Sequence, residues 1–170
     1  LVVGSDFKFG YCGEGKACEI AVLSDHMINT TIFNLIEYEH EKIGSTKILK
    51  LLGDGEIELV NELLGYNFFF SGNVIKGKQI GRKMGFPTAN IDNENVKGIL
   101  KKGVYGVKVH YNNLTYLGMM NIGYNPTCNF NSKISIEVNL FDANLDLYDK
   151  NIKIECFCYI REENKFNNQQ

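Results

Sequence analysis

The sequence of 170 residues lacks any apolar run long enough to form a transmembrane helix, so we expect no membrane partner. It also lacks an excess of positive charge, since the formal net charge is −2, and we expect no nucleic-acid partner. The amino terminus, Leu-Val-Val-Gly, has neither a basic region nor a cleavage site, which argues against a signal peptide. It looks instead like a buried strand that has lost whatever preceded it. Nothing in the composition indicates an oligomeric state.

Cysteine and histidine are too few and too scattered to suggest a disulfide framework or a zinc site. The five cysteines form no C-x-x-C pair, and the three histidines show neither metal nor triad spacing. Free thiols fit a reducing compartment, and we expect the cytoplasm. One group of alternating residues predicts the core face of a strand, and it consists of Ile152, Ile154, Cys156, Cys158 and Ile160.

The composition, 44% hydrophobic and 22% charged, is that of a globular chain, and its pattern changes near residue 66. Before that point, residues 1–3 and 30–37 are typical of strands. Ser45 can cap a helix that Gly53 stops, and Asp54 can cap a second helix that ends at Gly65. We interpret residues 1–65 as the tail of an α/β domain, too small to close a sheet of its own.

After residue 65 the helical pattern disappears and six short β-like runs follow. They are residues 66–75, 88–91, 103–111, 114–122, 133–140 and 152–160. Asn112 and Asn113, between two of these runs, predict a two-residue hairpin turn because Asn tolerates positive φ. Short strands without long helices between them predict a mainly β fold, a small antiparallel barrel.

A glycine-rich basic stretch occupies residues 77–90. Its glycines are Gly77, Gly81 and Gly85, and its cations include Lys78, Arg82 and Lys83. Glycines expose backbone N–H groups and cations complement a polyphosphate, so the stretch suits a phosphate ligand. The alternative is a mobile basic surface loop. A Walker P-loop is excluded, because Gln follows Lys78 where Ser or Thr is required, the spacer between the glycines is strand-like, and Pro87 soon follows where the motif needs a helix.

Thr88 and Asn90 lie two residues apart on a predicted strand, so their side-chain oxygens share one face. Such neutral, hard donors can hold Mg²⁺ when phosphates and water complete its shell. The alternative is that both residues only begin a strand after the turn at Pro87. A further loop-like segment, residues 121–127, could line a pocket.

Glu137 is the candidate general base. Alternation places Ser135, Glu137 and Asn139 on one face of their strand and puts Ile136 and Val138 on the other. If the polar face borders a ligand groove, Glu137 can accept a proton from a substrate hydroxyl. If it faces water, Glu137 is an ordinary surface acid.

Residues 67–166 carry several motifs in the order and spacing of a known family. They are Gly85-Phe-Pro-Thr-Ala-Asn-Ile91, Gly103-Val-Tyr-Gly106, Asn121-Ile-Gly123 with Pro126-Thr127, Ile136-Glu-Val138, Asp146-Leu-Tyr148 and Ile160-Arg-Glu-Glu-Asn-Lys-Phe166. This region resembles the riboflavin kinase module of the bacterial bifunctional riboflavin kinase/FMN adenylyltransferases, the FAD synthases. The resemblance implies a six-stranded Greek-key barrel over residues 66–170 that makes FMN from riboflavin and ATP.

The resemblance also implies roles for individual residues. Thr88 and Asn90 stand in the motif that binds Mg²⁺ and ATP, and Glu137 stands at the catalytic base. Arg161 stands near the flavin. The residues on the nucleotide side are Gly77, Lys78, Gly81, Arg82, Lys83, Gly85, Pro87, Thr88, Asn90, Asn121, Gly123, Pro126 and Thr127.

Residues 1–65 resemble the end of the FMN adenylyltransferase domain, a Rossmann-like nucleotidyltransferase, through Val3-Gly-Ser-Asp-Phe-Lys-Phe-Gly10 and Ile43-Gly-Ser-Thr-Lys-Ile48. The first half of that domain is not in the sequence, so we expect no adenylylation by these residues alone. Departures from the kinase pattern are Ala143, Asn144 and Asp149, and the family's last helix is missing. A catalytically silent flavin- or nucleotide-binding barrel and a generic interaction module are the alternatives.

Overall fold

The computed structural model describes residues 1–77, 88–124, 134–143 and 145–163, apart from the side chains of residues 95 and 97. Contacts between Cα atoms divide the chain into two compact units. Unit 1 is Leu1–Ser45 and unit 2 is Thr46–Gln170.

Unit 1 is built from very short elements. They are β1 (Val2–Gly4), β2 (Lys8–Phe9), η1 (Tyr11–Gly13), β3 (Gly15–Lys16), η2 (Ala17–Glu19), α1 (Ile20–Leu23), β4 (Thr31–Phe33), β5 (Glu37–Tyr38) and β6 (Glu41–Lys42). The predicted strand at residues 1–3 overlaps β1 and the one at residues 30–37 contains β4, and these two strands pair in parallel. Parallel pairing suits an α/β domain. The Rossmann-like parentage of unit 1 stays a prediction.

The two predicted helices are present, with small shifts at their ends. Helix α2 (Ser45–Asp54) has Ser45 as its first residue rather than as the cap before it, and it continues one residue past Gly53, which was expected to stop it. Helix α3 (Ile57–Leu64) is preceded by Glu56 rather than by Asp54. Gly65 ends α3 in the left-handed conformation at φ 74°, as its position after the last apolar residue predicted.

Both helices contribute to the core of unit 2. Leu52 of α2 and Ile57 and Val60 of α3 belong to the same buried cluster as the strands that follow. The boundary between compact units therefore lies at residues 45 and 46. The predicted boundary between family domains, at residues 65 and 66, stays a prediction.

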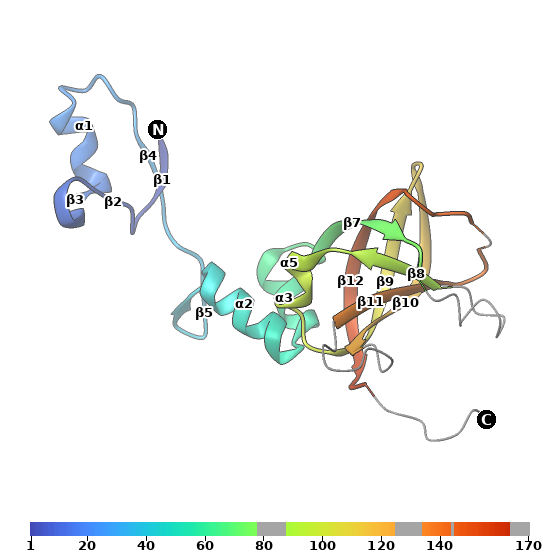
Figure 1. Cartoon of the computed structure of the whole chain (residues 1–170). Coiled ribbons are helices and arrows are strands. Elements are labelled where there is room, and N and C mark those ends of the chain that lie inside the picture. Colours follow the sequence, from blue (N-terminus) through green and yellow to red (C-terminus); the bar gives the residue numbers. More distant parts are fainter. Residues whose placement is uncertain (78–87, 125–133, 144, 164–170) are drawn as a thin grey trace. The chain divides into compact units, whose positions relative to one another are not determined.

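The described strands of unit 2 form a closed barrel, as Figure 1 shows. Its strands are β7 (Phe69–Ile75), β8 (Thr88–Asp92), β9 (Gly103–Tyr111), β10 (Leu114–Tyr124), β11 (Ile134–Leu140) and β12 (Asn151–Arg161), and the short helix α5 (Glu94–Lys97) lies between β8 and β9. The strand order around the barrel is β10-β11-β8-β7-β12-β9, and every pairing is antiparallel. The predicted six-stranded antiparallel barrel is confirmed.

The barrel closes around inward side chains that alternate with outward ones. Val107, Val109, Ile136 and Ile154 are each no more than 1% exposed. Such alternation is what a strand with one buried face requires. Each fully buried Val or Ile stabilises the fold by about 1.5–3 kcal/mol relative to an exposed one.

One predicted alternation is wrong at its end. Ile152, Ile154 and Cys156 are buried, but Cys158 is only partly buried and Ile160 is 49% exposed. The pairing of β12 with β9 shifts register between Cys156 and Cys158 and again before Arg161. A bulge of this kind adds a residue to one strand and re-aims the side chains that follow.

Two turns show why Asn and Asp stand where they do. Asn112 and Asn113 join β9 to β10 with φ of 50° and 60°, as the predicted hairpin turn requires. Asp149, where the resembled family has glycine, adopts φ 59°. Asp tolerates this left-handed conformation better than most residues.

Candidate functional site

Glu137 points away from the barrel core. Its neighbours along β11, Ile136 and Val138, are each 1% exposed and belong to the core, so the alternating Glu137 lies on the outer surface of the barrel. Its side chain is nevertheless half-buried. The predicted face of Glu137 is confirmed.

The register of the barrel places Glu137 between two asparagines. Asn90 of β8 is its partner on one side and Asn121 of β10 is its partner on the other. Directly opposed residues in antiparallel strands have Cβ atoms about 5 Å apart. Three predicted site residues, from segments far apart in the sequence, thus form one row across three strands.

The same row continues around the barrel. Asn121 pairs with Val104 of β9, and Val104 pairs with Arg161 at the end of β12. At about 4.8 Å per strand, Arg161 is about 14 Å from Glu137 along the sheet. The predicted base and the predicted flavin residue therefore share a row without touching each other.

Thr88 and Asn90 lie on the outer face of β8, because Ala89 packs against the core and Ile91 is buried. Thr88 is paired with Asn139 of β11, one outward position beyond Glu137. Both predicted metal ligands are thus beside the candidate base.

Gly77 closely approaches Asn90. A Cβ atom built on Gly77 would lie 2.1 Å from Asn90 Nδ2 and 2.9 Å from its Oδ1. Any side chain at position 77 would displace the Asn90 amide. Packing therefore requires a glycine at position 77 if Asn90, a predicted metal ligand, is to keep its place.

Burial raises the pKa of Glu137 above the ordinary value of a glutamate, because desolvation disfavours its charged form. A carboxylate with a raised pKa is a stronger base once it is ionised. Perturbed carboxyl groups of this kind are concentrated at functional sites.

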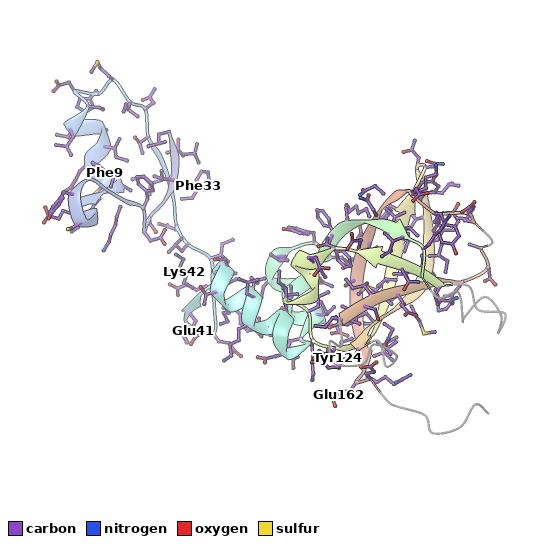
Figure 2. The ribbon with its side chains drawn as sticks, viewed as in Figure 1. Phe9, Phe33, Glu41, Lys42, Tyr124 and Glu162 are labelled. Carbon is purple, nitrogen blue, oxygen red and sulfur yellow. The ribbon has the colours of Figure 1, made fainter. Side chains whose placement is uncertain are left out.

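The ends of β10 and β12 meet beside this row. The Gly123 carbonyl accepts a hydrogen bond from Ser135 Oγ at 3.4 Å, and the Tyr124 N–H donates to Glu163 Oε2 at 3.4 Å. Figure 2 shows Tyr124 and Glu162 at this end of the barrel. The contact at Glu163 had no sequence signal, because a carboxylate bound to a backbone N–H 39 residues away leaves no pattern.

Other predicted site residues lie outside the described part of the chain, and nothing tests their positions. They are Lys78, Gly81, Arg82, Lys83, Gly85, Pro87, Pro126 and Thr127.

The oxygen donors around Glu137 fit a metal ion that binds together with the phosphates of a ligand. Within the described ranges, no group of three or more His, Cys, Asp or Glu side chains is arranged to hold a metal ion. Thr88 and Asn90 offer neutral oxygens, with the Glu137 carboxylate on the next strand. Mg²⁺ commonly takes one or two protein oxygens and completes its shell with phosphates and water. The donor set therefore fits such an ion.

Fold and site together define a class of protein: a small antiparallel barrel whose outer face combines one half-buried acid with neutral oxygen donors and glycines. The family model described as riboflavin kinase matches residues 64–170. The chain belongs to the riboflavin kinase family.

Two relatives and a solved structure show how far the likeness extends. A bifunctional riboflavin kinase/FMN adenylyltransferase of Listeria monocytogenes is 40% identical over 98% of this chain and 53% of its own length. An RNA-binding riboflavin kinase of Bacillus subtilis is 47% identical over 56% of this chain and 41% of its own. A Streptococcus pneumoniae crystal structure, described as a macrolide-efflux protein, superposes with a TM-score of 0.82 at 30% identity, covering 97% of this chain and 53% of that one.

The chain spans about half the length of the bifunctional relatives it matches. Across the described residues, no helix combines the length and the apolar character needed to cross a bilayer. The expectation that the protein binds no nucleic acid is not confirmed, because one relative carries an RNA-binding description.

Proposed function

We propose that unit 2 is a riboflavin kinase that transfers the γ-phosphate of ATP to the 5′-hydroxyl of riboflavin, giving FMN and ADP. The observation that carries the proposal is the row Asn90–Glu137–Asn121 on the outer face of a barrel of this family. It sets a half-buried acid between polar neighbours, beside Thr88 and Asn90 at the described end of the glycine-rich basic stretch.

Glu137 is the proposed base. Its carboxylate accepts the proton of the ribityl 5′-hydroxyl as that oxygen attacks the γ-phosphorus, and the bond from phosphorus to the bridging oxygen of ADP breaks. The raised pKa of Glu137 suits proton acceptance near neutral pH. Its position in the row lets Asn90 and Asn121 flank the reacting hydroxyl.

Thr88 and Asn90 are the proposed protein ligands of Mg²⁺, which would neutralise charge on the transferring phosphoryl group. Gly77 keeps the Asn90 amide in place, since any larger residue would displace it. The remaining glycines and cations of residues 78–85 are proposed to cover the phosphates, and residues 121–127 to line the nucleotide side. Catalysis would then rest on positioning and charge stabilisation.

Arg161 is proposed to contact the flavin. In a closed barrel of six strands, a position three strands from Glu137 lies on the opposite side of the barrel, so the proposed flavin role of Arg161 rests on the family resemblance and not on its distance from Glu137.

The direct test is to incubate the chain with riboflavin, ATP and Mg²⁺ and to measure FMN by chromatography. We expect Glu137→Gln to lower kcat by about 10²–10⁴-fold, the usual contribution of a general base. The matched control is Glu155→Gln, which makes the same change on β12, where the carboxylate pairs with His110 and Lys153 instead. FMN formed equally fast by Glu137→Gln would exclude Glu137 as the base. Riboflavin retained without FMN formation by the unaltered chain would favour the silent binder.

The pH profile gives a second readout. Because the pKa of Glu137 is raised, kcat/KM should fall as the pH drops through a value above the ordinary glutamate range. In Glu137→Gln this acid limb should disappear from the residual rate. An acid limb at an ordinary glutamate value in the unaltered chain would contradict the assignment.

For the whole protein we propose the bifunctional arrangement of its relatives, with unit 1 and its neighbouring helices derived from an adenylyltransferase domain. The parallel pairing of β1 with β4 supports an α/β origin.

A further inference from the structure

Glu163 lies where the ends of β10 and β12 meet, and no step of the proposed reaction uses it. It stands two residues after the end of β12, and its Oε2 accepts a hydrogen bond from the backbone N–H of Tyr124 at 3.4 Å. Tyr124 is the last residue of β10. Two residues of the proposed nucleotide side, Asn121 and Gly123, lie near this end of the same strand.

Gly123 gives the Glu163 carboxylate its space. A Cβ atom on Gly123 would lie 2.1 Å from Glu163 Oε1 and 2.7 Å from Oε2. No side chain fits at position 123 while the carboxylate occupies this place. The missing side chain of Gly123 and the acid at position 163 are therefore parts of one contact.

Tyr124 is also held through its ring. Lys102 Nζ lies 3.6 Å from the ring centroid, within the range of a cation–π interaction. Lys102 is in turn fixed by its own carbonyl, which accepts a hydrogen bond from Tyr159 Oη at 3.0 Å. The end of β10 is thus attached to β12 and to the segment before β9 by two independent contacts.

Glu162, the neighbouring acid, makes a different contact. Its Oε1 pairs with Lys101 Nζ at 3.2 Å. The two adjacent glutamates are both exposed and carry the same charge, yet only Glu163 contacts β10 among the described contacts. This difference supplies a matched control.

We propose that Glu163 is a positioning residue that holds the end of β10, where Asn121 and Gly123 of the proposed nucleotide side lie, in the arrangement that binds ATP. The inference rests on the proposed kinase reaction. Without this acceptor, the end of β10 gains conformational freedom that nucleotide binding must then remove, which weakens binding. The groups that touch the reacting atoms stay in place, so the effect falls on the KM for ATP rather than on kcat.

The test compares three full-length variants, Glu163→Ala, Glu163→Gln and Glu162→Ala, in the FMN assay with MgATP varied at saturating riboflavin. We expect Glu163→Ala to raise the KM for ATP by about three- to tenfold, the range expected from losing one ordinary hydrogen bond, with kcat changed less than about twofold. Glu163→Gln should restore most of the affinity, because its amide oxygen still accepts from Tyr124. Glu162→Ala should match the unaltered chain.

Amide hydrogen exchange gives a readout that does not depend on turnover. The Tyr124 amide should exchange faster in Glu163→Ala than in the unaltered chain or in Glu162→Ala. An unchanged KM for ATP in Glu163→Ala would overturn the inference, and so would an equal rise in Glu162→Ala or a Glu163→Gln variant as impaired as Glu163→Ala. An unaltered chain that makes no FMN would instead overturn the proposed function, and the inference would fall with it.

Discussion

Unit 1 and unit 2 use their hydrophobic residues in opposite ways. In unit 1 only Ala17 and Ile20 are buried hydrophobic residues, while Phe33 is 60% exposed and Met27 is 83% exposed. In the described part of unit 2, nineteen buried residues from α2, α3, α5, the strands and their connections form one cluster. Burial of apolar surface is the main favourable term in folding. Unit 2 therefore carries its own folding core, and the elements of unit 1 have little to hold them together by themselves.

The largest expected effect comes from truncating equivalent side chains in the two units. Ile154→Ala in the barrel, where Ile154 is 0% exposed, should lower the free energy of unfolding by about 2–5 kcal/mol. Ile32→Ala on β4, where Ile32 is 41% exposed, should change it by less than about 0.5 kcal/mol. Denaturant unfolding followed by circular dichroism measures both. Similar losses in the two variants would show that unit 1 has a core comparable to that of the barrel.

The second effect tests whether α3 belongs to the barrel. Asn61 Nδ2 donates to the Cys156 carbonyl at 3.0 Å, and its Oδ1 accepts from the Phe68 N–H at 2.7 Å. Asn61→Ala removes both hydrogen bonds and should lower the free energy of unfolding by about 1–3 kcal/mol. The control is Glu62→Ala, an exposed neighbour on the same helix that should be nearly neutral.

If Asn61→Ala left the unfolding midpoint unchanged, α3 would not be part of the barrel's cooperative unit. The division at residues 45 and 46 would then lose its energetic support, and the predicted boundary at residues 65 and 66 would describe the folding unit as well.

The strands of the barrel could be predicted from sequence because each depends on a pattern among residues close together in the chain. Alternation along residues 134–140 places Glu137 on the outer face, and two asparagines at residues 112 and 113 predict a hairpin. These features depend on a residue and its near neighbours. The structure therefore reproduces each of them.

The row through the site could not be predicted in the same way. The pairing of Glu137 with Asn90 and Asn121 depends on the register of three strands from distant segments, and a shift of one residue would separate them. The bulge in β12 had no sequence signal either, and it overturned the predicted inward position of Ile160. The family resemblance implied that Asn90, Asn121 and Glu137 belong to one site, and the strand register shows that they are neighbours.

A smaller effect is expected from the left-handed turn residues. Asp149 in unit 2 has φ 59° and Glu39 in unit 1 has φ 53°. Asp149→Gly should stabilise the barrel by about 0.5–1 kcal/mol, because glycine adopts this conformation without a Cβ penalty. Glu39→Gly relieves a similar conformation between β5 and β6, yet it should leave the unfolding transition unchanged, because unit 1 contributes little to it. A stabilisation by Glu39→Gly as large as that by Asp149→Gly would contradict the contrast between the units.

The smallest effect concerns the ion pair of unit 1. Lys42 Nζ contacts the Asp6 carboxylate, and the two side chains are 49% and 47% exposed. The hydrogen bond from Lys42 lowers the pKa of Asp6, so any stability from the pair is present at neutral pH and is lost as the pH falls through that lowered value. Solvent screening makes exposed pairs of this kind weak. Lys42→Ala should therefore leave the thermal unfolding midpoint unchanged at neutral pH, in low and in high salt. A clear, salt-sensitive loss of stability would show that ion pairs stabilise unit 1 in place of apolar burial. The two units would then differ in the kind of interaction that stabilises them rather than in how stable they are.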